Sequence, residues 1–104
     1  MTNETEKPID VIFKKEGDKG DKSPIAFFPT LPGDNDPYTC TSYARVGQHC
    51  SASKAYYLDL ESAKPEQFAP LKTELESLGY VLTVRKRWTQ THDTRRINAL
   101  DRAA

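Results

Sequence analysis

Apolar residues recur at every second position in several short stretches of this chain, the pattern of β-strands with one buried face. The segment 9–13 follows that period, and the apolar run 25–28 continues the strand signal until a proline interrupts it. Residues 16–23 between them are polar and rich in turn-forming types. The two runs therefore predict an antiparallel hairpin with a long polar loop.

Two further strands are expected in the middle of the chain. Residues 38–46 alternate with a small, weakly apolar inward face, and residues 55–60 alternate more clearly. Residues 47–53 between them have the composition of a turn. The preceding segment 29–37 contains three prolines and is predicted to be an irregular loop.

A helix is predicted over residues 67–78. Its apolar stripe consists of four residues at spacings of three and four: Phe68, Leu71, Leu75 and Leu78. Gly79 suits a left-handed cap at the end of the helix. Because proline disfavours a helix interior, the regular helix is expected to begin near Pro70, after an irregular first turn.

A strong final strand follows at residues 80–88, so the predicted order is β-β-β-β-α-β. The predicted fold class is α+β: a four- or five-stranded, mainly antiparallel sheet with one packed helix and an opposite face partly open to solvent. Residues 1–8 are expected to form a flexible arm and residues 9–88 a single α+β domain. Residues 89–104 are expected to form a basic C-terminal tail with a weak helical signal.

Composition and charge restrict the functional classes. The chain has 104 residues and a formal net charge of zero, enough for one domain with a modest core. The charge is unevenly spread, because residues 1–84 carry a net charge of −4 and residues 85–104 a net charge of +4. Such asymmetry points to an electrostatic partner or to a solvated, arginine-rich end of the chain.

The sequence favours a cytoplasmic location. No apolar stretch approaches the ~20 residues of a membrane span, and the first residues lack the basic and apolar regions of a signal peptide. Two cysteines without an export signal are typical of cytosolic thiols.

Reactive side chains gather in residues 38–53, which hold Cys40, Cys50 and His49. A cysteine nucleophile needs a nearby base, and His49 beside Cys50 points to the opposite face of an extended segment. No cysteine and histidine pair has the spacing of a structural zinc site, and no glycine-rich phosphate loop occurs. We therefore expect no metal, no cofactor and no enzymatic activity. One alternative is that the protein is a cysteine-dependent enzyme or a thiol sensor.

Protein binding is the leading hypothesis, because exposed tyrosine and arginine are residue types that dominate protein interfaces. The residues expected to contact a protein partner are Tyr38, Tyr43, Arg45, Gln48, His49, Ser51 and Tyr57.

Binding of RNA or single-stranded DNA is the other alternative. Basic side chains would contact phosphates and a tryptophan ring would stack on a base. The residues concerned are Arg85, Arg87, Trp88, Arg95 and Arg96. Against this alternative, the isoelectric point of about 6.7 is well below that of a typical nucleic-acid-binding domain.

The segment Tyr-Ala-Arg-Val-Gly-Gln-His-Cys-Ser-Ala at 43–52 and the segment Leu-Glu-Ser-Leu-Gly-Tyr at 75–80 resemble small uncharacterised bacterial proteins found on phages and mobile elements. The resemblance covers about residues 9–87 and implies no known activity. It favours a small inhibitor that binds a host protein or a nucleic-acid-targeting defence complex.

Overall fold

The structure is a computed structural model that describes residues 8–16, 23–44 and 48–103. Most of the predicted N-terminal arm lies outside these residues. The elements, in chain order, are β1 (Ile9–Glu16), β2 (Ser23–Pro32), β3 (Thr39–Ala44), β4 (Gln48–Ser53), α1 (Lys54–Asp59), β5 (Glu61–Ser62), α2 (Pro65–Ser77), β6 (Leu82–Val84) and α3 (Gln90–Ala103).

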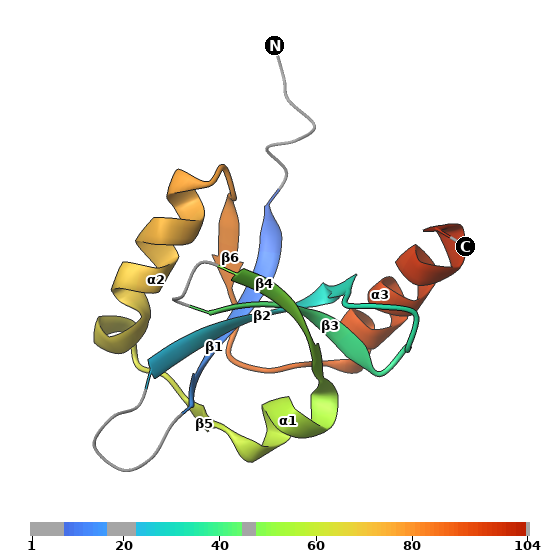
Figure 1. Ribbon diagram of the computed structural model, residues 1–104, viewed down its shortest axis with the longest axis horizontal. Helices are drawn as coiled ribbons and strands as arrows, with labels where there is room; N and C mark the ends of the chain where they lie inside the picture. The colour runs from blue at the N-terminus through green and yellow to red at the C-terminus, as the bar shows by residue number, and fades with distance from the viewer. Residues whose placement is uncertain (1–7, 17–22, 45–47, 104) are drawn as a thin grey trace.

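Within the described residues, six strands form one sheet at the centre of the molecule (Figure 1). Five of them lie in the order β4-β3-β2-β1-β5, and each pairs antiparallel with its neighbours. The sixth strand, β6, pairs in parallel with β1. The predicted α+β class with a mainly antiparallel sheet is therefore confirmed.

The outer edge of β1 is shared by two short strands. β5 pairs with Lys14 and Lys15 near its end, and β6 pairs with residues 9–11 near its start. The backbone carbonyl of Val11 accepts a hydrogen bond from Arg85, and that of Phe13 accepts one from Ala63. Neither β5 nor β6 pairs with residue 12 of β1. A notch therefore remains between the two short strands.

Both faces of the sheet are covered, which corrects the expectation of one partly solvated face. Figure 1 shows α2 and α3 on opposite sides of the strands. Beneath α2 lies a cluster that includes Val11, Phe13 and Phe28. On the other face Ile12 and Phe27 pack with further residues: Ile25, Cys40, Ala52, Tyr57, Leu60 and Trp88. Successive residues of β1 and β2 are therefore buried on alternate faces, as in a sheet covered on both sides.

Helix α2 begins at Pro65, earlier than the expected start near Pro70. Pro65 occupies the first helical turn, where its missing N–H is not needed. The side chain of Gln67 accepts a hydrogen bond from the backbone N–H of Lys64 at 2.8 Å, which fixes this start. The helix buries Leu71 and Leu75 against the sheet, and Gly79, with a φ of 105°, follows its end in the left-handed conformation.

Two local predictions between residues 47 and 60 are wrong. Residues 48–53 form strand β4 where a turn was expected, and residues 54–59 form helix α1 where a strand was expected. Ser53 caps α1 by accepting a hydrogen bond from the backbone N–H of Tyr56 at 3.1 Å. Tyr57 is the one buried residue of this helix. Its packing and the Ser53 cap therefore outweigh the alternating pattern of residues 55–60, which predicted a strand.

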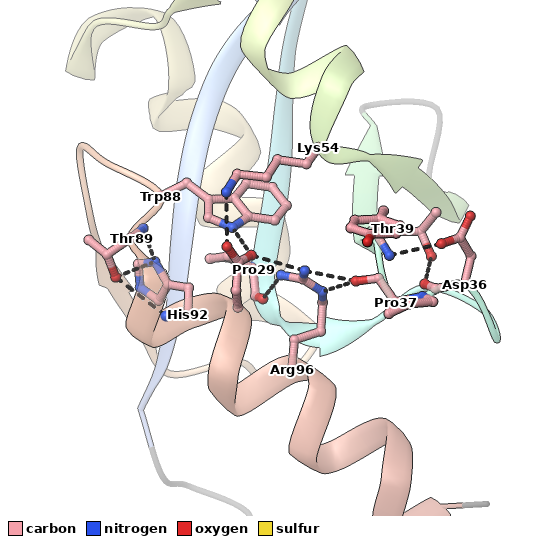
Figure 2. Close-up of polar contacts among 11 residues, drawn as sticks. Pro29, Asp36, Pro37, Thr39, Lys54, Trp88, Thr89, His92 and Arg96 are labelled. Atoms are coloured by element: carbon pink, nitrogen blue, oxygen red, sulfur yellow. Dashed lines mark hydrogen bonds and ion pairs between the residues drawn. The ribbon is translucent and has the colours of Figure 1, made fainter.

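Helix α3 is held to β2 by the buried side chain of Arg96, which is 2% exposed. Figure 2 shows its guanidinium directed from the helix toward Pro29 of β2 and Pro37 of the loop before β3. Nη1 donates to the carbonyl of Pro29 at 3.0 Å, and Nη2 donates to that of Pro37 at 2.9 Å. The segment predicted as a C-terminal tail is thus a helix packed against the sheet.

Asp93 supplies the counter-charge for this buried cation. Its carboxylate lies 2.9 Å from Nη2 of Arg96 and accepts hydrogen bonds from Trp88 Nε1 at 2.7 Å and from Lys54 Nζ at 2.9 Å. The Trp88 ring lies between the two cations, with centroid distances of 5.1 Å to Arg96 Cζ and 5.5 Å to Lys54 Nζ. We name these four residues, Lys54, Trp88, Asp93 and Arg96, the α3 anchor.

Arg96→Met should lower the free energy of unfolding by about 3–5 kcal/mol, because it leaves Asp93 and two carbonyls without the guanidinium. Urea denaturation followed by circular dichroism measures this change. Arg95→Met is the matched control: Arg95 is the exposed neighbour on the same helix, and its loss should change stability by no more than about 0.5 kcal/mol. Equal effects of the two substitutions would contradict the anchor.

Acid should weaken the same anchor. Burial raises the pKa of Asp93, but hydrogen bonds from Lys54, Trp88 and Arg96 outweigh burial and hold the pKa below its ordinary value. The stabilisation is therefore complete above the unfolded-state pKa of about 4 and is lost as the pH falls through the folded-state pKa. Asp93→Asn should be less stable at pH 7 and should lose less stability than the wild type between about pH 4 and pH 2. Asp101→Asn, an exposed position on α3, should follow the wild-type curve.

Candidate functional site

Strand β4 is a free edge of the sheet. It pairs along its whole length with β3, from Thr39↔Ser53 to Ala44↔Gln48, and no described strand pairs with its other side. Its sequence, Gln-His-Cys-Ser-Ala-Ser, contains neither lysine nor proline. Proteins commonly protect exposed edges with these residues, so the outer edge of β4 is open to an added strand.

A hollow of about 340 Å³ lies beside this edge, on the face opposite α2. The small side chains of Ser42, Ala44 and Cys50 leave this space, and Ile25 and Tyr56 contribute larger apolar surfaces. A strand added to β4 would place alternate side chains over this face.

Three of the residues predicted to contact a partner are exposed along this side of the molecule. Tyr38 is 71% exposed just before β3. His49 is exposed on β4, and its Nε2 lies 2.8 Å from the hydroxyl of Tyr80. Ser51 is also exposed and donates a hydrogen bond to the carboxylate of Asp34 at 3.0 Å.

The other predicted partner-binding residues are placed differently. Tyr43 is buried and donates a hydrogen bond to Glu74 of α2, which, together with its burial, raises the pKa of the phenol. Tyr57 is buried against Phe27 and Trp88. Neither tyrosine therefore presents its ring to a partner. Arg45 and the side chain of Gln48 lie outside the described residues.

The residues of the nucleic-acid alternative divide into two groups. Trp88 and Arg96 belong to the α3 anchor, so the predicted stacking ring and one predicted phosphate contact are used inside the fold. Arg85, Arg87 and Arg95 instead line a hollow of about 430 Å³. Lys86, the basic residue between them, shares the lining, and so do Thr89 and Thr91, which the sequence did not single out.

A hydrogen-bonded network forms the wall of this basic hollow. The backbone N–H of Thr89 donates to Nδ1 of His92 at 3.0 Å, and Nε2 of His92 lies 2.8 Å from the carboxylate of Asp10. A neutral imidazole protonated on Nε2 satisfies both contacts. Burial raises the pKa of Asp10, but hydrogen bonds from His92 and Arg85 outweigh burial and hold it below its ordinary value. Asp10 is thus an ionised group whose charge is already balanced by Arg85.

The two cysteines differ sharply in environment. Cys40 is fully buried, and burial raises the pKa of its thiol to about 12, so it is protonated at neutral pH. Cys50 is exposed on β4, and neither cysteine forms a disulfide. His49 contacts Tyr43 and Tyr80 on the α2 side, whereas Cys50 lines the hollow on the other side. His49 is therefore not positioned as a base for Cys50.

The described residues contain neither a metal-binding cluster nor a membrane-spanning helix. Nowhere among them do three or more of the metal-binding residue types His, Cys, Asp and Glu gather closely enough to hold an ion. In the same part of the chain, no helix combines the length and apolar character needed to cross a membrane.

The two thiols should react at very different rates with an aromatic disulfide reagent. Cys50 should be modified rapidly in the folded protein and Cys40 only on unfolding, because the reagent needs an exposed thiolate. In Cys50→Ser, thiol release should appear only in denaturant, whereas Cys40→Ser should react rapidly without it. Fast reaction of Cys40 in the native protein would contradict the burial of β3.

Comparisons with known proteins give no match: no family model, curated protein or solved structure is similar to this chain.

Proposed function

We propose that this chain is a small non-enzymatic binding protein that takes an extended segment of a protein partner along the outer edge of β4. The observation that carries the proposal is the open, unprotected edge of this strand. In such strand addition, backbone hydrogen bonds supply affinity and pockets for alternate side chains supply specificity. The hollow beside Cys50 and Tyr56 offers such a pocket.

The contrast with the opposite side of the sheet supports this choice. β6 spans only Leu82–Val84 and leads directly into Arg85, Lys86 and Arg87. Short length and adjacent charge are common means of protecting an edge from unwanted pairing. β4 is twice as long as β6, and none of its six residues is lysine, arginine or proline. The difference favours β4 as the edge that accepts a partner.

The exposed side chains flanking β4 are suited to protein recognition. Tyr38 offers a large ring and a hydroxyl, a combination enriched at interface hot spots. His49 and Ser51 add polar groups on the strand itself. The proposed interface thus keeps Tyr38, His49 and Ser51 of the predicted set and replaces the buried Tyr43 and Tyr57 by the strand edge.

The proposal places the protein in the cytoplasm, because a reducing compartment keeps cysteines such as Cys40 and Cys50 as the free thiols found here. Binding of β4 to an extended segment of a host or defence protein would prevent that segment from pairing with its usual partner, and this would inhibit the protein. That role is the one that the resemblance to phage and mobile-element proteins favours.

Cys50→Lys should weaken partner binding by at least about tenfold, since a lysine on an edge strand opposes the docking of another strand. The assay is capture of partners from nuclease-treated extracts of the source organism, followed by affinity measurement with the purified partner. Thr73→Lys adds the same charge at an exposed position of α2 and should bind as the wild type does. A partner that binds Cys50→Lys and the wild type equally would contradict the proposed edge.

A further inference from the structure

Two hollows with opposite chemistry meet at Arg85 and Lys86. One is the basic hollow of about 430 Å³ at the start of α3. The other, of about 290 Å³, is the notch between β5 and β6, and its lining is mainly apolar. Arg85 and Lys86 line both, so one ligand can occupy the two hollows at once.

The basic hollow is lined by three cationic side chains that make no contact needed for the fold. Lys86, Arg87 and Arg95 are exposed and make no hydrogen bond or ion pair with any described residue. Arg85, by contrast, is paired with Asp10 at 3.2 Å. The single carboxylate in the lining is thus already balanced, and three positive charges are available to an anion.

Neutral donors complete the lining. Thr91 lies in the first turn of α3, whose N-terminus carries a partial positive charge. Thr89 caps this helix by accepting a hydrogen bond from the backbone N–H of His92 at 3.3 Å. This hollow is lined by arginine guanidinium groups, a lysine and threonine hydroxyl groups. These groups donate hydrogen bonds and are suited to the oxygen atoms of a phosphate group.

The notch adds a mainly apolar surface next to these cations. Ile12, Val84 and Pro65 line it, together with Phe68, whose ring is stacked on Phe13 at a centroid distance of 4.2 Å. The notch exists because β5 pairs with β1 after residue 12 and β6 pairs with β1 before it. A planar aromatic ring can pack against this apolar lining.

We propose that these joined hollows bind a nucleoside phosphate, with the phosphate at Lys86, Arg87 and Arg95 and the base in the notch. A phosphate ester that carries a planar ring matches both halves, whereas an acidic peptide matches only the cations. The ligand is either a free nucleotide or one unit of a single-stranded nucleic acid. This site lies apart from β4 and does not depend on the proposed protein partner.

Titration of the ¹⁵N-labelled full chain with AMP, ribose 5-phosphate and an oligouridylate tests the site by nuclear magnetic resonance. AMP should bind at least about tenfold more tightly than ribose 5-phosphate, because stacking of the base adds to the phosphate contacts. Amide signals of residues 63, 64 and 84–91 should move together. Tighter binding of the oligouridylate than of AMP would assign the ligand to a single strand, and tighter binding of AMP than of the oligouridylate would assign it to a free nucleotide.

The double substitution Arg87→Gln and Arg95→Gln should reduce binding of the preferred ligand at least about tenfold, with the fold unchanged because both side chains are unpaired. Arg102→Gln, which removes one exposed charge at the far end of α3, and Cys50→Lys should bind as the wild type does. Equal binding of AMP and ribose 5-phosphate, equal competition by polyglutamate, or no binding of either nucleotide ligand would overturn the proposal.

Discussion

The buried guanidinium of Arg96 is the constraint on which the C-terminal third of the structure depends. It joins three segments that are distant in sequence: the end of β2 through Pro29, the loop before β3 through Pro37, and α3 itself. Because a buried cation requires a counter-charge and full hydrogen bonding, Asp93 and Trp88 are fixed with it. This arrangement turns Trp88 inward and leaves the preceding basic residues on the surface, so the same contact that closes the core also creates the basic hollow.

Much of the fold follows from local patterns. Alternation located β1 and β3, the apolar run 25–28 located β2, and the apolar stripe with Gly79 located α2. The burial of the second face of the sheet could also be predicted from the sequence, since unbroken apolar runs such as 25–28 are typical of strands buried on both sides. The errors at β4 and α1 have a different origin. A helix of six residues has little stability of its own, and the packing of Tyr57 together with the Ser53 cap stabilises it.

The candidate sites were harder to predict because they depend on distant partners. Arg95 and Arg96 are neighbours of identical type, yet one lines a surface hollow and the other lies in the core. No local signal separates them, since the carbonyls that bind Arg96 belong to residues about sixty positions away. The free edge of β4 is likewise a property of the strand order, and the notch is a property of how two short strands share β1.

The position of β1 has a consequence for how the chain acquires its structure. This first strand pairs with β6, and its Asp10 contacts His92, 82 positions away in sequence. Contacts between such distant positions slow folding, because the chain must close large loops before they form. On the ribosome, Val11 and Phe13 therefore emerge long before their last neighbours are made. The nascent chain carries an incomplete sheet until β6 emerges and pairs with β1, a stage at which exposed strand edges are prone to aggregation.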